Sequence, residues 1–283
     1  MSEPLVSIEN LRVAFRDDDG VYNEAVRGVS FSLGREKLGI VGESGSGKSL
    51  TGRSLLGVLP PHARMSADKL SFDGIDLLKA SPKLRRSLRG GRMGMILQDP
   101  KFSLNPVMRV GQQIVEAIRI GDRRVGGAEA RQRAIASLEA VHIREPARVF
   151  DLYPHELSGG MGQRVMIAMM VVREPDLLVA DEPTSALDVS VRAQVLSILD
   201  ELVTRRGMGL IFVSHDLNLV SRFCDRVIVM YAGRIVETIA ANRLHEATHP
   251  YTRGLLSCLP SIDGSLAPLP TLIREASWLE AAP

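Results

Sequence analysis

The segment that decides the fold is Lys37–Ser49, with the sequence KLGIVGESGSGKS. Its apolar first half predicts a short β-strand, and Gly42–Ser49 satisfies G-x-x-x-x-G-K-[ST], the pattern of a phosphate-binding loop that opens a helix. Glycines let the backbone approach phosphate oxygens, while successive N–H groups and the helix N-terminus favour an anion. A chance match in such a chain has odds of roughly one in a hundred. The segment therefore predicts a site for nucleotide phosphates.

The composition is that of a folded globular protein, since the 283 residues are 45% hydrophobic and 24% charged. A net charge of +2 is too small to indicate a nucleic-acid footprint, and the basic cluster Arg85–Arg92 is typical of a solvated helix face. No apolar run approaches the roughly 20 residues that a membrane-spanning helix needs. Because Met1–Asn10 also lacks the features of a secretory signal, we expect the chain to stay inside the cell.

The order of strand and helix patterns predicts an α/β core. Apolar runs without polar alternation, such as Leu177–Ala180 and Leu210–Val213, indicate strands buried on both faces of a mostly parallel sheet. Between Gln98 and Leu157 the pattern becomes helical, which predicts an inserted helical subdomain at about 99–165. We expect the main domain to span 1–240, followed by a C-terminal extension over 241–283 that is rich in Pro, Ala and Leu.

Two carboxylates, Asp181 and Glu182, end the predicted strand Leu177–Ala180. Acids at a strand end are often only a solvated turn, but ligands of open α/β sheets bind at this edge, and the chain carries a phosphate loop. Asp181 would hold Mg²⁺ through its water shell, and Glu182 would orient and deprotonate an attacking water. In the loop, Lys48 would reach the β- and γ-phosphates and Ser49 would ligate Mg²⁺.

A second glycine-rich segment, Leu157–Met161 (LSGGM), precedes a predicted helix. It offers free backbone N–H groups, and Ser158 is placed either as a helix N-cap or as a donor to phosphate. Taken alone, such a segment is usually a flexible turn.

Taken together, six ordered motifs resemble those of the ABC ATPases. They are GESGSGKS, Gln98 after MGMIL, LSGGM, LLVADE, Ser185–Asp188 (SALD) and His215 after LIFVS. The resemblance covers about Leu5 to Gly233 and implies a P-loop (RecA-like) ABC ATPase core with an antiparallel β subdomain and an inserted helical subdomain. It also implies ATP and Mg²⁺ as ligands.

The resemblance gives each matching residue a role. Gln98 would contact the metal or the attacking water, His215 would bond the γ-phosphate, and Asp188 would lie at a dimer junction. Phe15 is the candidate for stacking on adenine, with Tyr22 as the alternative. The implied catalytic residues are Lys48, Gln98, Glu182 and His215. The implied metal ligands are Ser49, Gln98 and Asp181. The implied nucleotide-binding residues are Phe15, Gly42, Glu43, Ser44, Gly45, Ser46, Gly47, Lys48, Ser49, Leu50, Gln98, Ser158, Gly159, Gly160, Met161, Asp181 and Asp188.

A closer resemblance appears in 98–116 (QDPKFSLNPVMRVGQQIVE) and in 249–260 (HPYTRGLLSCLP). Both are similar to segments in the ATP-binding subunits of bacterial dipeptide, oligopeptide and nickel importers, which implies ATP-driven import of peptides or a related small solute. Import of nickel or another solute, a soluble ABC ATPase not coupled to transport, and a degenerate ATP-binding module are the alternatives. A degenerate module should lack Glu182 or His215, and both are present.

The resemblance also implies partners. A second ABC ATPase subunit, more often a homologous chain than a second copy, would complete each ATP site in trans across a head-to-tail dimer. Two transmembrane permease subunits and an extracytoplasmic solute-binding protein would complete the importer, with no nucleic acid involved. The chain would lie on the cytoplasmic face of the inner or cell membrane as a peripheral subunit.

Two features depart from the family pattern, and a third matches a zinc motif that we do not expect to bind zinc. Gly162 stands where that subfamily commonly has Arg, which costs roughly 0.5–1 kcal/mol of helix propensity. The extension has only Cys258, so we expect no iron–sulfur cluster. His245–His249 (HEATH) satisfies the zinc motif H-E-x-x-H, but Pro250 pushes His249 out of the helical region, and we expect no zinc there.

Overall fold

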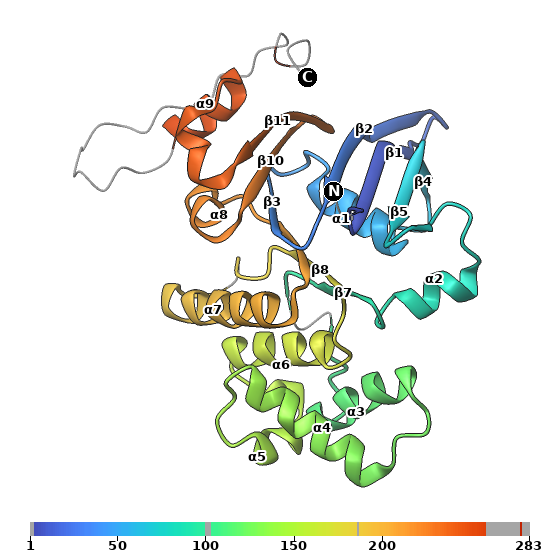
Figure 1. The fold of residues 1–283 in the computed structure, drawn as a ribbon, viewed down its shortest axis with the longest axis vertical. Coiled ribbons are helices and arrows are strands. Elements are labelled where there is room, and N and C mark those ends of the chain that lie inside the picture. Colours follow the sequence, from blue (N-terminus) through green and yellow to red (C-terminus); the bar gives the residue numbers. More distant parts are fainter. Residues whose placement is uncertain (1–2, 100–102, 186, 259–277, 279–283) are drawn as a thin grey trace, which may run out of the picture. The chain divides into compact units, whose positions relative to one another are not determined.

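The computed structural model describes residues 3–99, 103–185, 187–258 and Trp278 (Figure 1). The chain divides into two compact units. Unit 1 combines Met1–Lys79 with Ile211–Pro283, and unit 2 is Ala80–Leu210. Each unit carries part of the sequence motifs, and each is described by itself.

Unit 1 contains an antiparallel sheet with the strand order β2-β1-β5-β6, to which β4 adds by pairing with β1. This sheet corresponds to the expected antiparallel β subdomain. Alternate residues of its central strand, such as Leu11 and Val13, are buried, so one face packs on a core. Its strands are β1 (Val6–Arg16), β2 (Tyr22–Leu33), β4 (Ala63–Ser66), β5 (Lys69–Phe72) and β6 (Ile75–Asp76).

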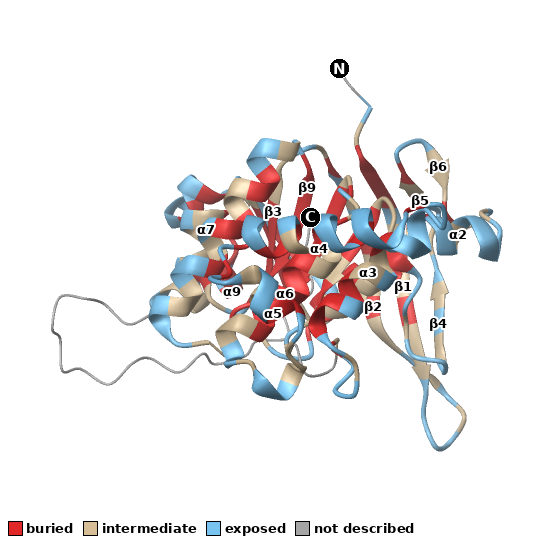
Figure 2. Cartoon of the chain, turned by 90° about the horizontal axis from the view of Figure 1, so that it is seen from below, coloured by how far each residue is buried: buried red, intermediate tan, exposed pale blue. Residues whose placement is uncertain are grey.

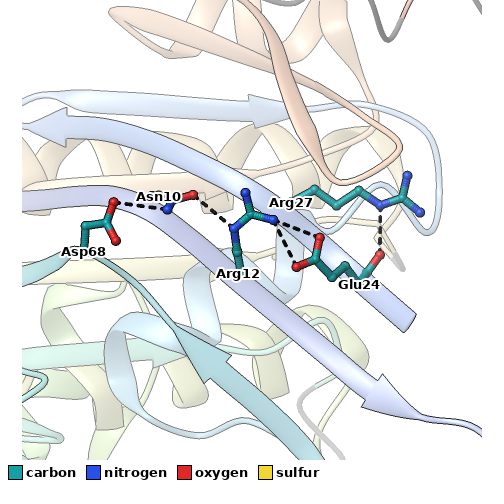
Figure 3. A network of polar contacts seen from close by, with 5 residues as sticks. All are labelled: Asn10, Arg12, Glu24, Arg27 and Asp68. Carbon is teal, nitrogen blue, oxygen red and sulfur yellow. Dashed lines mark hydrogen bonds and ion pairs between the residues drawn. The ribbon is translucent and has the colours of Figure 1, made fainter. Parts of the chain in front are cut away.

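A chain of polar contacts crosses this sheet (Figure 3). Asn10 Nδ2 donates to Asp68 Oδ2 at 3.1 Å, and Arg12 Nε donates to Asn10 Oδ1 at 3.1 Å. The Arg12 guanidinium also bonds both carboxylate oxygens of Glu24 at 3.0 Å, while Arg27 Nε donates to the Glu24 carbonyl. Because these side chains are part-exposed, the Arg12–Glu24 pair contributes at most about 1 kcal/mol to stability. Its main effect is to fix the pairing of β1 with β2.

Unit 1 also holds strands of the larger sheet, in the order β11-β10-β3-β9. Strands β3 and β10 pair in parallel, and β11 runs antiparallel to β10. Ile40 and Phe212 are completely buried, as expected for strands covered on both faces. The elements are β3 (Lys37–Val41), α1 (Lys48–Leu56), β9 (Gly209–Val213), α8 (Leu217–Phe223), β10 (Arg226–Tyr231), β11 (Arg234–Ala240), the 3₁₀ turn η3 (Ala241–Glu246) and α9 (Pro250–Ser257).

Unit 2 combines two parallel strands with a set of helices. In its described residues, the chain between the two strands forms no further strand, which agrees with the helical pattern of the sequence there. The elements are α2 (Pro82–Leu88), β7 (Met93–Ile96), α3 (Val110–Gly121), α4 (Gly127–Ala140), α5 (Pro146–Phe150), η2 (Pro154–Glu156), α6 (Gly159–Val171), β8 (Leu177–Asp181) and α7 (Val189–Arg206).

The helices of unit 2 bury a core of their own, seen as red segments on α5 and α6 in Figure 2. Ile114, Ala134 and Ile167 are fully buried there, on α3, α4 and α6. A Cβ added at Gly111 would lie 2.2 Å from the Phe150 ring, so only glycine allows α3 to approach this ring so closely. The helical region thus has its own apolar core, while the boundaries 1–240, 99–165 and 241–283 stay predictions.

None of the described helices combines the length and the apolar character that crossing a membrane requires.

Candidate nucleotide site

The predicted phosphate loop lies between β3 and α1, and its glycines sit where the backbone needs them. Gly42 and Gly47 have φ angles of 148° and 95°, in the region that side chains disfavour. A Cβ at Gly42 would lie 2.1 Å from the Met230 carbonyl oxygen, and one at Gly47 would lie 2.8 Å from that of Ala25. Strands β10 and β2 therefore back the loop closely enough to exclude any other residue at both positions.

Lys48 is the first residue of α1 and is only 5% exposed. Its Nζ donates to the Gly42 carbonyl at 2.8 Å and to the Glu43 carbonyl at 2.7 Å. These two carbonyls hold the ammonium group inside the loop, and charged phosphate oxygens are stronger partners for an ammonium group than neutral carbonyls are. Ser44 and Gly45 at the loop tip are exposed, which leaves the loop open to a ligand.

His215 follows β9, the strand next to β3. The N–H of the preceding Ser214 donates to the Ile40 carbonyl at 3.1 Å, so β9 ends level with the strand that enters the loop. Asp216 then caps α8 by accepting from the N–H of Leu219 at 3.0 Å. His215 is exposed between these two fixed neighbours, on the same sheet edge as the loop.

The aromatic candidate Phe15 lies near the end of β1. It is two residues after Val13, so both side chains project from the same face of the strand. Val13 pairs with Val26 on β2, and a Cβ at Gly47 would lie 3.1 Å from a methyl group of Val26. Phe15 therefore shares the strand face that lies toward the phosphate loop.

Tyr22, the alternative, occupies the other face. It pairs with Arg16, whose side chain projects opposite to that of Phe15. The Arg64 guanidinium carbon lies 3.9 Å from the centre of the Tyr22 ring, so a cation already covers this ring. Of the two aromatic residues, the geometry favours Phe15 for a contact with adenine, which stays a prediction.

Unit 2 brings the two acidic residues and Gln98 to one strand edge. Asp181 ends β8 and is 4% exposed, and Glu182 follows it. Because Ile96 of β7 pairs with Ala180 of β8 in parallel register, Gln98 and Glu182 leave the sheet at the same level. The predicted metal ligands Asp181 and Gln98 thus come from neighbouring strands.

Glu182 has a left-handed backbone, with φ at 48°. Its carbonyl accepts from the N–H of Ser185 at 3.3 Å and from the Ser185 hydroxyl at 3.1 Å, which holds the turn. Left-handed non-glycine residues are strained and concentrate at functional sites. The turn therefore fixes the direction in which the predicted base leaves the strand.

The second glycine-rich segment opens α6. The Ser158 hydroxyl accepts from the N–H of Met161 at 3.3 Å, which confirms the predicted N-cap. Nothing described lies within 4 Å of a Cβ added at Gly159, whereas one at Gly160 would lie 2.6 Å from Val191 on α7. Gly160 thus permits the close approach of α6 to α7, and Gly159 leaves the helix start open.

Asp188 caps α7, the helix that Gly160 contacts. Its carboxylate accepts from the N–H of Val191 at 3.0 Å and from the Ser190 hydroxyl at 2.8 Å. The bond from the Val191 N–H, with that from Ser190, holds the pKa of Asp188 below its ordinary value. Asp188 is therefore a charged cap, on an exposed surface that also suits the predicted junction. Ala186, in the same SALD motif, lies outside the described residues.

Gln163 is a residue that sequence reasoning missed. It is 1% exposed on α6, and its Nε2 donates to the Pro183 carbonyl at 2.6 Å. This bond ties the helix that begins at Ser158 to the residue directly after Glu182. The available signal was a glutamine two residues before the apolar run Val165–Val171 in the same helix.

The HEATH segment does not form a zinc helix. The 3₁₀ turn η3 ends at Glu246, and His249 has extended backbone angles (φ −67°, ψ 131°) as the N-cap of α9. This confirms that Pro250 keeps His249 out of the helical position. His245 is exposed while His249 is 5% exposed, and no cluster of three possible His, Cys, Asp or Glu metal ligands occurs among the described residues.

Both cysteines are thiols in the described part of the chain. Cys224 is buried, and burial raises the pKa of its thiol to about 12. Cys258 is the C-cap directly after α9, and no disulfide joins the two residues.

Comparison with known proteins identifies the family and the fold class of this chain. The model of the family described as ABC transporter matches residues 26–185. The structure of a dimeric bacterial ABC transporter cassette, MJ0796, has a TM-score of 0.74 with 26% identity, and the match covers 83% of this chain and 98% of that one. The chain belongs to the ABC transporter family, and its fold class is that of the ABC ATPase cassette.

The relatives found by sequence belong to a narrower group within this family, the ATP-binding proteins of peptide transport. The chain is 47% identical to a putative peptide import ATP-binding protein of Brucella abortus (strain 2308), over 95% of this chain and 81% of the relative. It is also 47% identical to the dipeptide transport ATP-binding protein DppD of Escherichia coli (strain K12), over 90% of this chain and 78% of that protein. The resemblance to peptide importers is thereby confirmed.

Proposed function

We propose that this chain binds and hydrolyses ATP as the motor subunit of an importer for di- or oligopeptides. The observation that carries this proposal is a phosphate loop in which backbone contacts exclude any side chain at Gly42 and Gly47, in a chain 47% identical to peptide import ATP-binding proteins. Nickel import and a soluble ATPase role are the competing functions.

The residues present fit MgATP. Exposed N–H groups at Ser44 and Gly45 and the Lys48 ammonium suit phosphate oxygens, and Phe15 suits adenine. The Ser49 hydroxyl, the Gln98 amide and the Asp181 carboxylate offer oxygen atoms, which are the donors that Mg²⁺ prefers. When bound, the metal would neutralise charge on the β- and γ-phosphates.

Hydrolysis needs a base and groups that hold the γ-phosphate. Glu182, directed by its left-handed backbone, would accept a proton from the attacking water, which Gln98 would help to orient. His215 would donate a hydrogen bond to the γ-phosphate. Lys48, still held by the loop carbonyls, would balance the charge that develops on the transferred group.

The start of α6 would serve a second subunit. Ser158, Gly159, Gly160 and Met161, with Asp188 beside them, would contact ATP held by the phosphate loop of a homologous partner chain. A dimeric ABC cassette among the structural relatives supports this arrangement. A heterodimer with a homologous chain is the preferred form, on the cytoplasmic face of the membrane.

A groove of about 1130 Å³ in unit 2 offers a surface for the permease subunits. Its apolar lining includes Met108, Ile120 and Phe150. Its charged residues are Lys83, Arg86, Arg119, Arg123, Arg131 and Arg173 against the single acid Glu116. We propose that it receives an amphipathic permease segment with an acidic edge, because this excess of positive charge favours such a partner.

Charge reversal in this groove should weaken assembly. Arg119→Glu with Arg123→Glu should reduce binding of the detergent-solubilised permeases about tenfold or more, because like charges repel. ATP binding by the full chain should not change. Arg144→Glu, an exposed arginine of the same unit outside the groove lining, is the control. Equal permease binding by both variants would reject the groove.

Reconstitution tests the function itself. The chain, its homologous partner subunit and the permeases in proteoliposomes should hydrolyse ATP several-fold faster with a peptide-loaded binding protein than with an empty one, and should accumulate labelled dipeptide. The Ni²⁺-loaded binding protein is the comparison. Stimulation by Ni²⁺ alone would support nickel import, and ATPase activity indifferent to both would support a soluble ATPase.

A further inference from the structure

The segment after β11 packs onto β10, one of the two strands that back the phosphate loop, and onto β11. In Figure 1, α9 lies beside β10 and β11. His249 N-caps this helix through Nδ1, which accepts from the Tyr251 N–H at 3.2 Å. Tyr251 and Thr252, in its first turn, are completely buried. The first turn of α9 is thus part of the core of unit 1.

Glu237 of β11 fixes the entry to this helix. Its Oε1 accepts from the N–H and hydroxyl of Thr248 at 2.7 and 3.1 Å, and from the N–H of His249 at 3.3 Å. Burial alone would raise the pKa of Glu237, but the nearby Thr252 hydroxyl and the hydrogen bonds from Thr248 and His249 hold this pKa below its ordinary value. A charged carboxylate therefore organises the backbone directly before Tyr251.

The Tyr251 ring is held by other aromatic rings. Its centre lies 4.5 Å from that of Tyr231, the last residue of β10, and 5.6 Å from that of Trp278. Trp278 is 5% exposed and is the only tryptophan of the chain. Burial on several sides leaves the Tyr251 ring little freedom, so the position of its hydroxyl is fixed.

That hydroxyl meets the phosphate loop. Tyr251 Oη accepts from the Glu43 N–H at 3.0 Å. The same peptide unit carries the Gly42 carbonyl, which accepts from Lys48 Nζ at 2.8 Å. One peptide plane is thus held from its N–H side by Tyr251 and from its C=O side by Lys48, and such linked bonds polarise one another.

We propose that Tyr251 is a positioning residue for the phosphate loop: its hydroxyl fixes the peptide between Gly42 and Glu43, and through it the Lys48 ammonium, for binding of nucleotide phosphates. This inference rests on the proposed nucleotide site. It gives the segment His249–Ser257 a role in ATP binding, since Tyr251 in its first turn bonds a loop residue 208 positions earlier in the chain.

The test is Tyr251→Phe in the full chain, which removes the hydroxyl and keeps the ring. The dissociation constant for MgATP, measured by calorimetry, should rise about fivefold, because one hydrogen bond that orders the loop is lost. In the assembled complex KM should rise similarly with kcat within twofold, as expected for a loss of ground-state binding.

Tyr231→Phe is the matched control. It makes the same change in the same aromatic cluster, and no hydrogen bond joins its hydroxyl to the loop among the described residues. Both variants should keep the wild-type emission maximum of Trp278, which reports that the cluster is still packed. A red shift of this maximum in Tyr251→Phe would mean that the aromatic cluster is no longer packed. The loss of MgATP affinity would then come from the packing defect, and the role proposed for the Tyr251 hydroxyl would be wrong.

A double-mutant cycle tests the link to Lys48. In a Lys48→Ala background, Tyr251→Phe should change MgATP affinity less than twofold, because the group that it positions is gone. An unchanged affinity in the single variant, or a full fivefold loss in both backgrounds, would overturn the proposal. Failure of the wild-type chain to bind ATP at all would instead reject the proposed nucleotide site.

Discussion

Glu182→Gln should bind MgATP within twofold of wild type and lose roughly 100- to 10,000-fold in ATPase rate in the assembled complex. The amide keeps the shape of the side chain but cannot accept the proton of the attacking water, and a general base contributes about that factor. The left-handed turn that Ser185 holds should persist, because its bonds go to the backbone carbonyl of residue 182. Calorimetry and a phosphate-release assay measure the two quantities.

Glu174→Gln is a close control for this change. Glu174 is exposed in the same unit and also has a left-handed backbone, with φ at 53°. Its substitution should leave the ATPase rate within twofold of wild type. Turnover by Glu182→Gln near the wild-type rate would show that another group is the base.

Lys48→Ala should weaken MgATP binding by the full chain roughly 10- to 100-fold, because hydrogen bonds to charged groups contribute about 1.5–3 kcal/mol. The change also leaves the Gly42 and Glu43 carbonyls without their ammonium donor. Lys48→Met, which keeps most of the length and apolar bulk of the side chain, separates loss of charge from collapse of the loop. Both variants should bind weakly.

Lys69→Ala serves as the control, since Lys69 is an exposed residue of the same unit that pairs with Glu9 at 3.5 Å. Its affinity for MgATP should equal that of wild type. If Lys48→Met bound MgATP normally while Lys48→Ala did not, the lysine would act by filling space, and the assigned charge contact with phosphate would be wrong.

Much of the site was predictable because it is encoded locally. Lys37–Ser49 forms the predicted strand, loop and helix start, Ser158 is the predicted N-cap, and His249 is extended before Pro250. Each of these outcomes depends on φ preferences and on hydrogen bonds between near neighbours. The sequence also specified the family, because ordered local motifs are difficult to obtain by chance.

The choice between Phe15 and Tyr22 shows where local information ends. Both are aromatic residues at the ends of paired strands, and the pattern left both open. The register between β1 and β2 places them on opposite faces, and Arg64 covers the Tyr22 ring. A register is set by pairing across the sheet and by the bulges in it, so the two were distinguished only after folding.

The sequence by itself determined the family, the phosphate loop, the acidic strand end and the helix N-cap at Ser158 of this protein. Only the tertiary structure decided that Gln163 reaches the residue after Glu182 and that Tyr251 reaches the phosphate loop. Glu43 and Tyr251 are 208 positions apart, and no local pattern specifies such a pair. The contact exists because packing of many apolar side chains offsets the entropy of closing so long a loop and sets two distant backbones side by side.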